Sequence, residues 1–364
     1  MAPDRLSCFT ADHAPQPPTQ THDCSWCDPA PGRGGPPDPH PGRLRGRVEL
    51  GPILGPLHLG RRRGHLDTDH HPPVDVVHLR RPPESDRGTG LAAVACGSPT
   101  VCLALDTSGR AYRQTGSGWT GPATLTSQAR GSGGVSLSCA GPSSCVAIPT
   151  GGDQAVSWDG RAWNPPGTVA AGSALEAVGC ASSGYCAAVD AEGNAFALSG
   201  GSWHATSGDW GSVSAVSCVS ATFCVSVSGG ISRWDGSSWT TPDSLGAASS
   251  FTGVSCPAPT ACTAVDTTGE ALSWNGTAWS APVPVEPMPV PGAGNDPTVT
   301  AVSCPTSSFC ASVDDAGGLL LERNGSWTRT EVDPGHGLTG ISCPSPTACL
   351  AVDDGGNVLV GKAG

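Results

Sequence analysis

Residues 252–279 read TGVSCPAPTACTAVDTTGEALSWNGTAW, and this pattern recurs seven times between residues 91 and 364. Every copy contains a Cys-x5-Cys pair, and the first cysteines follow one another at intervals of 43, 41, 38, 38, 48 and 39 residues. A period of about 40–45 residues is typical of four-stranded β-propeller blades. The sequence therefore predicts an all-β, seven-bladed β-propeller over residues 88–364.

Each copy divides into four short segments separated by turn-forming residues. An apolar segment ends in the first cysteine, and the second segment follows the pattern Cys-x-Ala-Val-Asp, as at 262–266. The third segment follows an Asp-x-x-Gly turn, and the fourth follows Asp159-Gly160, Asp235-Gly236 or Asn275-Gly276. These dipeptides favour two-residue type I′ hairpins. We therefore expect one meandering antiparallel sheet per copy, which must stack on its neighbours to bury both of its faces.

Asp-x-x-Gly turns begin the third segment in five of the seven copies. An aspartate at the first turn position can accept hydrogen bonds from the backbone amides that follow it, and glycine tolerates the positive φ that closes the turn. Pro149 and Ser228 replace the aspartate in the other two copies. The five predicted turn aspartates are Asp106, Asp190, Asp266, Asp314 and Asp353.

The fourteen cysteines of the repeats are predicted to form seven local disulfides. Two cysteines that flank a five-residue hairpin loop can lie opposite each other, about 4.5–5.5 Å apart. Zinc is the competing interpretation, but structural zinc sites prefer about two to four residues between paired cysteines and need four ligands together. Disulfides predict an oxidising compartment, and hence an extracellular or cell-surface location. The predicted pairs are Cys96–Cys102, Cys139–Cys145, Cys180–Cys186, Cys218–Cys224, Cys256–Cys262, Cys304–Cys310 and Cys343–Cys349.

Tryptophan recurs near the end of most copies, often as Trp-(Asp/Asn)-Gly-x-x-Trp. If Asn275-Gly276 forms a two-residue turn, Trp274 opposes Thr277, and its indole lies diagonal to that of Trp279 on one face. The indoles can fill the core between blades, or rings left exposed can stack on the apolar faces of sugars. The candidate ligand-binding residues hold the second tryptophan position: Trp119, Trp163, Trp203, Trp239, Trp279 and Trp327.

Residues 1–87 differ from the repeats. They contain sixteen of the 35 prolines and eight of the ten histidines, and they lack hydrophobic periodicity. We expect either a disordered low-complexity segment or an incorrectly assigned start of the coding sequence. No signal peptide opens the chain. At the other end, the seventh copy stops at Gly364 before its fourth strand, and Glu84–Gly90 offers no replacement, so we predict six complete blades and a three-stranded seventh.

The net charge of −12 lies entirely in the repeats. Residues 1–87 carry eleven arginines and eleven acidic residues, which leaves eight basic and twenty acidic residues for 88–364. Such an acidic surface repels a phosphate backbone, so we expect no nucleic-acid partner. The chain has no run of about 18 apolar residues, so we also expect no membrane span.

The repeats lack a recognisable catalytic set, so we predict a protein that is not an enzyme, with no cofactor and no bound metal. A sialidase-like propeller would need a tyrosine nucleophile and acid/base carboxylates, and the repeats offer only Tyr112 and Tyr185, at different repeat positions. Only His204 and His336 lie in this region, which leaves little for general-base chemistry.

The pattern Ser-Cys-x5-Cys-x-Ala-Val-Asp-x-x-Gly…Trp-x-Gly-x-x-Trp resembles the cysteine-containing propeller repeats of exported actinobacterial proteins. It is more loosely similar to Asp-box, tectonin and WD-repeat propellers. The resemblance covers residues 91–364 and implies the propeller fold and an exported location, whereas propellers serve many functions. We expect a non-enzymatic binding module for carbohydrate, cell-envelope polymer or another extracellular protein. The alternatives are the ectodomain of a larger sensor or receptor kinase and, less favoured, a glycoside hydrolase-like propeller.

Overall fold

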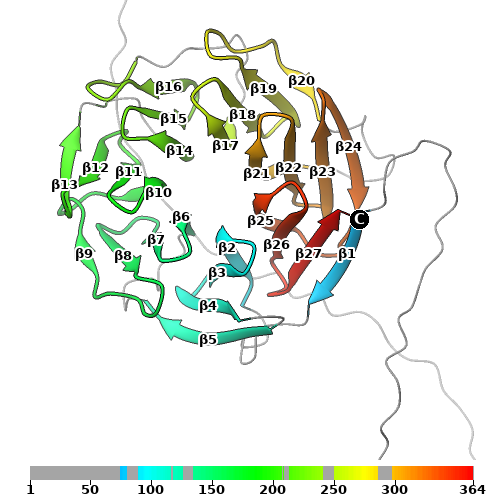
Figure 1. The fold of residues 1–364 in the computed structure, drawn as a ribbon, viewed down its shortest axis with the longest axis horizontal. Coiled ribbons are helices and arrows are strands. Elements are labelled where there is room, and N and C mark those ends of the chain that lie inside the picture. The colour runs from blue at the N-terminus through cyan, green and yellow to red at the C-terminus, as the bar shows by residue number, and fades with distance from the viewer. Residues whose placement is uncertain are drawn as a thin grey trace, which may run out of the picture. The chain divides into compact units, whose positions relative to one another are not determined.

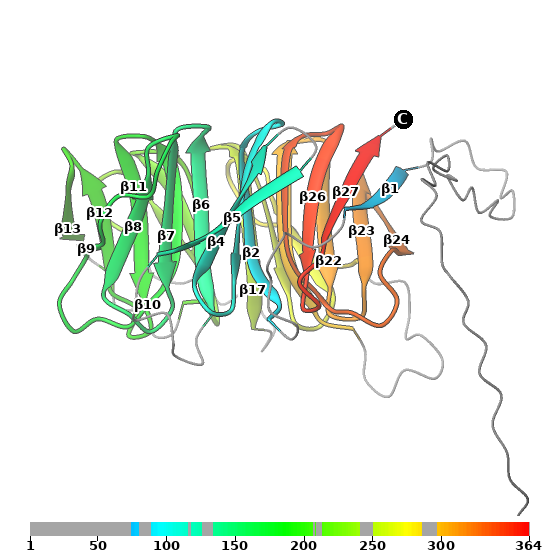
Figure 2. The ribbon, with the colours of Figure 1, turned by 90° about the horizontal axis from the view of Figure 1, so that it is seen from below.

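The computed structural model describes residues 74–79, 89–115, 118–125, 134–206, 208, 213–240, 250–285 and 297–363. They belong to one compact unit, Thr68–Gly364. Seven antiparallel sheets stand side by side in a ring (Figure 1), and their strands run between the two flat faces of that ring (Figure 2). The described residues contain no helix that is both long and apolar enough to span a membrane. The seven-bladed propeller predicted from the repeat is therefore confirmed.

Each sheet is one blade, in which consecutive strands run from the centre of the ring to its rim. Blade 1 consists of β2 (Leu91–Ser98), β3 (Val101–Asp106), β4 (Arg110–Thr115) and β5 (Gly118–Thr124). Blade 2 consists of β6 (Val135–Gly141), β7 (Ser144–Pro149), β8 (Gln154–Trp158) and β9 (Gly167–Thr168). Blade 3 consists of β10 (Leu175–Ser182), β11 (Tyr185–Asp190), β12 (Ala195–Ser199) and β13 (Ser202–Thr206). Blade 4 consists of β14 (Ala215–Ser220), β15 (Phe223–Val227) and β16 (Ile231–Trp234). Blade 5 consists of β17 (Phe251–Ala258), β18 (Ala261–Asp266), β19 (Glu270–Trp274) and β20 (Val283–Pro284). Blade 6 consists of β21 (Val299–Thr306), β22 (Phe309–Asp314), β23 (Gly318–Arg323) and β24 (Ser326–Glu331). Blade 7 consists of β25 (Leu338–Ser345), β26 (Ala348–Asp353), β27 (Val358–Ala363) and, at its rim, β1 (Val74–Leu79).

Blade 7 receives its fourth strand from the other end of the chain. The seventh repeat supplies three strands, as predicted, and β1 pairs antiparallel with β27 from Val74↔Ala363 to Leu79↔Val358. No strand was expected in residues 1–87, although the sequence VDVVHL of β1 is rich in β-branched residues and lies between two Pro-Pro pairs. The remainder of that segment, for which disorder was predicted, lies outside the described residues.

Blade 4 differs from the expected four strands. Its sheet contains three strands within the described part of the chain, and a single bridge between Trp234 and Trp239 follows β16. The outermost strands of blades 2 and 5 are similarly reduced, to the two residues of β9 and of β20. The rim of the ring is therefore less regular than the repeat pattern predicts, while the inner strands are complete in all seven blades.

A serine before the first cysteine links most blades to the next. The backbone amide of Cys180 donates a hydrogen bond to Ser138 Oγ of the preceding blade at 2.9 Å. Four more junctions repeat this contact, through Ser217, Ser255, Ser303 and Ser342. Ala95 and Gly179 hold the same position at the two remaining junctions. The Ser-Cys dipeptide of the repeat thus satisfies buried backbone donors between blades.

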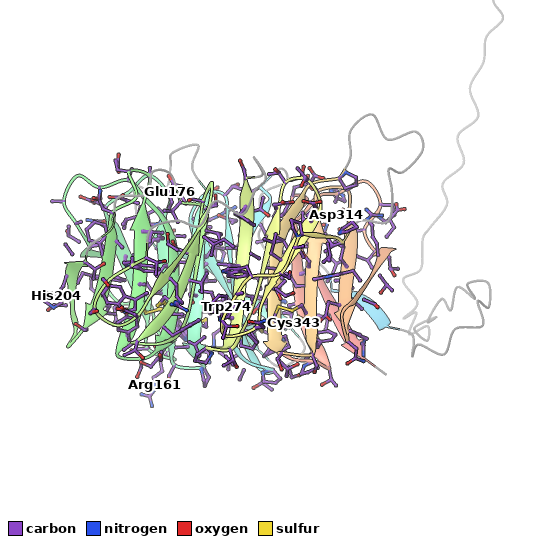
Figure 3. The ribbon with its side chains drawn as sticks, turned by 90° about the horizontal axis from the view of Figure 1, so that it is seen from above. Arg161, Glu176, His204, Trp274, Asp314 and Cys343 are labelled. Atoms are coloured by element: carbon purple, nitrogen blue, oxygen red, sulfur yellow. A yellow bond between two sulfur atoms is a disulfide. The ribbon has the colours of Figure 1, made fainter. Side chains whose placement is uncertain are left out.

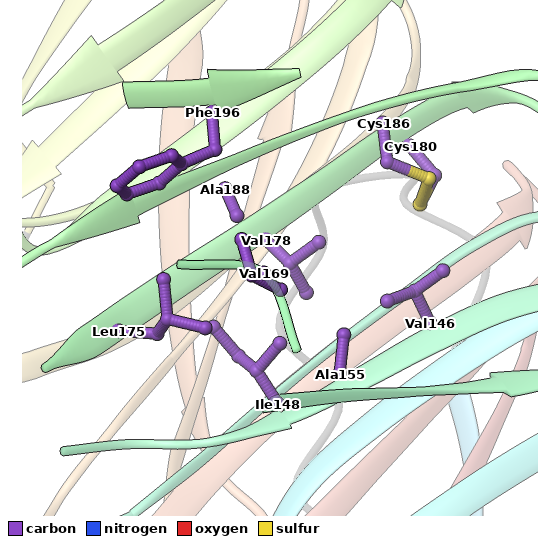
Figure 4. Close-up of a cluster of buried hydrophobic side chains, with 10 residues drawn as sticks. All are labelled: Val146, Ile148, Ala155, Val169, Leu175, Val178, Cys180, Cys186, Ala188 and Phe196. Atoms are coloured by element: carbon purple, nitrogen blue, oxygen red, sulfur yellow. A yellow bond between two sulfur atoms is a disulfide. The ribbon is translucent and has the colours of Figure 1, made fainter. Parts of the chain in front are cut away.

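Apolar side chains from neighbouring blades form the core. Between blades 2 and 3, Ile148 and Ala155 pack against Leu175, Val178 and Phe196 (Figure 4). Ile148 and Leu175 are fully buried, and each such side chain contributes about 1.5–3 kcal/mol of hydrophobic free energy. Similar clusters fill the other junctions, including the one between blades 7 and 1 that completes the ring. The core therefore lies between the blades, as the stacking of single sheets requires.

All seven predicted disulfides are present. Each joins the first two strands of one blade, with Cα–Cα distances of 4.0–4.1 Å. Four of the pairs are directly opposite in the strand register, as the five-residue loop predicts. The zinc alternative is wrong for these cysteines, because every one of them is bonded to its neighbour.

The Asp-x-x-Gly turns form as predicted, and their aspartates are fully buried. Asp190 has no exposed surface, and its Oδ1 accepts hydrogen bonds from the amides of Glu192 at 3.1 Å and Asn194 at 2.8 Å. Its Oδ2 accepts a third from Asn194 Nδ2 at 2.9 Å. The other four turn aspartates are likewise fully buried and accept amides through Oδ1. A buried carboxylate tolerates this position because backbone donors satisfy it.

The residue type that binds the second oxygen of these carboxylates is not the same in all blades. Arg110 Nε lies 2.7 Å from Asp106 Oδ2, and Arg329 Nε lies 2.7 Å from Asp314 Oδ2. Asparagine fills this role in blades 3 and 7, at the fourth residue after the aspartate. In blade 5 that residue is Glu270, and Asp266 Oδ2 is buried without a hydrogen-bond partner in the described structure. Blade 5 therefore contains a buried acceptor without a partner, whereas the corresponding oxygen has a partner in blades 1, 3, 6 and 7.

Candidate functional site

The two faces of the ring carry different turns. In a four-strand meander, the first and third turns lie at one end of the blade and the second turn lies at the other. The disulfide loops and tryptophan hairpins therefore share one face, here called the disulfide face, and the buried aspartate turns share the opposite Asp face. Figure 3 shows Trp274, Cys343 and Arg161 toward one face and Asp314 and Glu176 toward the other.

The tryptophan hairpins differ from the predicted two-residue turns. Trp274 lies directly opposite Trp279 in the strand register, with ring centroids 5.8 Å apart. The loop between them has four residues, and Asn275 Oδ1 accepts hydrogen bonds from the amides of Thr277 and Ala278, both at 2.9 Å. The predicted diagonal arrangement is wrong, because a side-chain oxygen that binds two amides stabilises the wider loop.

Aspartates hold the same loops in blades 2 and 4. Hydrogen bonds from the amides of Ser238 and Ser237 lower the pKa of Asp235 to about 2. Those from Ala162 and Arg161 lower the pKa of Asp159. Both side chains are exposed to solvent. The hairpins therefore place ionised carboxylates on the disulfide face at neutral pH.

The six candidate tryptophans do not meet at one site. Each lies on a different blade and packs on the core that its blade shares with the preceding one. Trp119 is 7 % exposed, and the other five are half-buried. This position agrees with the interpretation that the indoles fill the space between blades. Two of them, Trp203 and Trp279, also line grooves that are open to solvent.

The larger groove lies between blades 2 and 3 and has a volume of about 660 Å³. Trp203 and Leu198 line one wall, and Trp158, Asp159 and Asn164 line the other. Serine, threonine and glycine supply much of the remaining surface, and none of the described residues of the lining is basic. Volumes of roughly 300–1,000 Å³ are usual for small-molecule sites.

A hydrogen-bonded pair shapes the blade 2 wall of this groove. The Asn164 amide donates to the Ser157 carbonyl at 2.8 Å, and Asn164 Nδ2 donates to Ser157 Oγ at 2.9 Å. These bonds leave the Asn164 side-chain oxygen and one of its N–H donors for a ligand. Beneath them, Val146 and Ala155 belong to both the groove and the core between the blades. The wall is therefore held rigidly by the fold.

Comparison with other junctions explains why the groove opens here. The guanidinium of Arg113 lies 5.2 Å from the ring centre of Trp158 between blades 1 and 2, and Arg233 lies 5.2 Å from Trp274 between blades 4 and 5. Between blades 2 and 3 the corresponding residues are Ser157 and Leu198. Both are smaller, so a larger space stays open between blades 2 and 3, about 660 Å³ against about 340 Å³ between blades 4 and 5.

Blade 3 also replaces the tryptophan loop by a tighter turn. Ser199 and Ser202 pair directly, and Gly200 and Gly201 have φ values of 59° and 83°. Such a two-residue turn requires positive φ at both central positions. Sequence reasoning singled out Trp203 but not Ser157, Asn164 or Leu198. The available signal was the departure of blade 3 from the Trp-x-Gly-x-x-Trp pattern.

The described residues contain no group of three or more His, Cys, Asp or Glu side chains that could hold a metal ion. Within the groove, Asp159 is the one carboxylate of the lining. The arrangement offers aromatic, hydroxyl and amide surfaces to a ligand, together with one ionised acceptor.

No protein-family model and no curated protein matches this chain. Solved structures match it over most of its length. The WD40 β-propeller domain of Doa1 has a TM-score of 0.65 at 12% identity, covering 81% of this chain and 98% of that one. The RRP9 WD40 repeats have a TM-score of 0.64 at 9% identity, covering 80% and 99%. YCF48 bound to D1 peptide has a TM-score of 0.59 at 13% identity, covering 80% and 97%. At these identities the likeness shows a shared propeller fold, whereas function rests on the chemistry of the grooves.

Proposed function

We propose that this protein is a non-enzymatic binding module of an extracytoplasmic compartment, and that it holds a neutral saccharide chain between blades 2 and 3. One observation carries this proposal: this groove joins a tryptophan to hydroxyl and amide side chains, and none of the described residues that line it is basic. Sugars present apolar C–H faces and polar hydroxyl edges, so they need this combination of surfaces.

The residues of the groove suit separate parts of a sugar ring. Trp203 offers an apolar ring surface, while Asn164 and Ser202 offer donors and acceptors for hydroxyl groups. Asp159 adds an ionised oxygen that accepts strong hydrogen bonds from hydroxyl donors. A neutral polyhydroxylated ligand uses all of these groups without introducing a charge that the groove must balance.

The chemistry of Asp159 favours binding over hydrolysis. Glycoside hydrolysis ordinarily needs two carboxylates, and one of them must retain a proton near neutral pH. Asp159 is the one carboxylate among the described residues of the lining, and amide hydrogen bonds lower its pKa. This supports a binding role in preference to a glycoside hydrolase-like one.

The seven disulfides support the proposed location. Structural disulfides form and persist in oxidising compartments and are rare in the cytosol. A role as the ectodomain of a sensor or receptor kinase is compatible with the same groove, since a sensor also needs a ligand site.

Calorimetry against neutral oligomers of glucose, mannose and N-acetylglucosamine tests the proposed function. We expect at least one of them to bind and Asn164→Ala to weaken that binding about tenfold, because the side chain loses its hydrogen bonds to the ligand. Asp235→Ala, in the hairpin of blade 4, is the control and should keep the affinity, because Asp235 does not line the groove between blades 2 and 3. Absence of binding to all three oligomers would refute a neutral saccharide ligand.

A peptide is the second candidate ligand. It is favoured by one similar propeller, YCF48, whose structure is described as bound to a peptide. A peptide library displayed alongside the oligosaccharides separates the two classes. Peptide binding that Asn164→Ala abolishes, without any sugar binding, would assign the groove to a protein partner.

A further inference from the structure

A second groove lies between blades 4 and 5 and has a volume of about 340 Å³. Trp279 and Trp274 line its blade 5 side, and Arg233 and Thr240 line its blade 4 side. It is thus the counterpart, two blades further around the ring, of the groove between blades 2 and 3.

The two grooves use equivalent repeat positions. In blade 4, Trp234 lies opposite the second cysteine, and Arg233 is the residue before it. In blade 2, Trp158 lies opposite the second cysteine, and Ser157 is the residue before it. Thr240 pairs with Arg233 as Asn164 pairs with Ser157: its amide donates to the Arg233 carbonyl at 2.8 Å, and its Oγ1 accepts the Arg233 amide at 3.0 Å. The second groove therefore keeps the same backbone frame and replaces a hydroxyl by a guanidinium.

A cation–π contact places that guanidinium over the ring of Trp274. The Arg233 Cζ atom lies 5.2 Å from the ring centre of Trp274, and no ion pair joins Arg233 to an acidic side chain of the described residues. By contrast, Arg110 and Arg329 both pair with buried aspartates. A guanidinium in a cation–π contact still has N–H donors for a planar or tetrahedral anion.

We propose that the groove between blades 4 and 5 binds a saccharide unit that carries an anionic group. Arg233 pairs with the anion, Trp279 packs against the sugar ring, and the hydroxyls of Thr240 and Thr277 face the ring hydroxyls. This inference rests on the proposed function and extends it: the two grooves recognise a neutral unit and a charged unit of envelope polysaccharide. A carboxylate and a phosphate satisfy the same guanidinium fork.

The overall charge of the repeats makes this pairing selective. With a net charge of −12, the propeller repels anions at long range. An anionic sugar that binds must therefore find a local cation, and adding salt should screen both the repulsion and the local pairing. Removal of the one guanidinium in the groove should abolish the preference for acidic sugars.

The test compares two arginine variants by calorimetry on the full chain. The probes are an oligomer of galacturonic acid, the neutral galactose oligomer of the same length, and glucose 6-phosphate. We expect the acidic oligomer to bind at least tenfold more tightly than the neutral one and Arg233→Gln to remove that difference. Arg113→Gln is the matched control, because Arg113 makes the same 5.2 Å cation–π contact with Trp158 and lines neither groove.

The binding of the three probes to the two arginine variants separates the possible outcomes. Loss of acidic binding in Arg233→Gln but not in Arg113→Gln supports the inference, and tighter binding of glucose 6-phosphate than of galacturonate identifies the anion as phosphate. Equal loss in both variants, or equal affinity for the acidic and neutral oligomers, overturns it. Neutral binding that is sensitive to Asn164→Ala and unaffected by Arg233→Gln would then leave the proposed function standing alone.

Discussion

The two faces of the propeller use the same turn residue at different depths. On the Asp face, Asp106 and its four counterparts are fully buried and accept hydrogen bonds from nearby donors. On the disulfide face, Asp159 and Asp235 bind amides in the same manner but are exposed. Burial makes the first set structural, whereas Asp159 of the second set lines the groove between blades 2 and 3. The comparison leads to the expectation that loss of a turn aspartate costs more stability on the Asp face than on the disulfide face.

The largest expected effect is the loss of a buried turn carboxylate. Asp106→Ala removes the acceptor of Arg110 and Tyr112 as well as of two backbone amides. Removing one partner of a buried ion pair costs roughly 3–5 kcal/mol, so we expect the free energy of unfolding to fall by about that amount. Asp159→Ala on the other face should have a far smaller effect. Chemical denaturation of both variants measures the difference, and equal losses would abolish the distinction between the faces.

Removal of one disulfide should cost less. Closing a loop of this size stabilises a protein by about 2 kcal/mol on the chain-entropy model. The double variant Cys218→Ala/Cys224→Ala, in blade 4, should lose that amount and remain folded, because the cores between blades persist. Urea denaturation under non-reducing conditions provides the measurement. Complete unfolding at 25 °C would mean that the disulfide face contributes more to stability than the Asp face.

Blade 5 offers a change that should stabilise the fold. Glu270→Asn places at blade 5 the residue that satisfies the turn carboxylate in blades 3 and 7. A donor for the buried Asp266 Oδ2 should raise the free energy of unfolding by about 1 kcal/mol. The reverse change in blade 3, Asn194→Glu, should lower it. If both variants denature like the wild type, the second oxygen of the turn aspartates has no structural importance.

The smallest effect concerns the exposed ion pair at the junction of blades 6 and 7. A hydrogen bond from His336 Nδ1 to Asp354 Oδ1, 3.1 Å long, raises the pKa of His336 above its usual 6.5. A raised histidine pKa gives stability that is fully present below pH 6.5 and is lost as the pH rises through the folded-state pKa. NMR titration should show the pKa falling back toward 6.5 in Asp354→Asn. An unchanged pKa would show that the hydrogen bond does not hold the proton.

The sequence predicts the parts of this molecule that repeat. The Cys-x5-Cys spacing determines the disulfides and the blade count, and the Asp-x-x-Gly spacing determines the buried turns, because both depend on local backbone geometry. The fourth strand of blade 7 could not be assigned in the same way. It pairs residues 74–79 with residues 358–363, a contact that no local pattern encodes.

The candidate site shows the same limit. Repetition drew attention to the tryptophans, yet each packs on the core beside the preceding blade. The groove between blades 2 and 3 lies where blade 3 departs from the repeat, at Leu198 and the Gly200-Gly201 turn. Both grooves are also lined by a position that varies between blades, which is Ser157 in blade 2 and Arg233 in blade 4. Whether such substitutions open a space depends on the facing residue of the next blade. That residue is known only once the blades are placed side by side.

The central claim is that the groove between blades 2 and 3 binds the ligand, and Ser157→Arg tests it most directly. This substitution places an arginine beside Leu198, at the position that Arg113 and Arg233 hold in their own blades, and should narrow the groove without disturbing the core below. Calorimetry against the neutral oligosaccharides, with the unfolding free energy measured in parallel, is the experiment. We expect at least a tenfold loss of affinity in a protein as stable as the wild type. Unchanged affinity in the folded variant would contradict it.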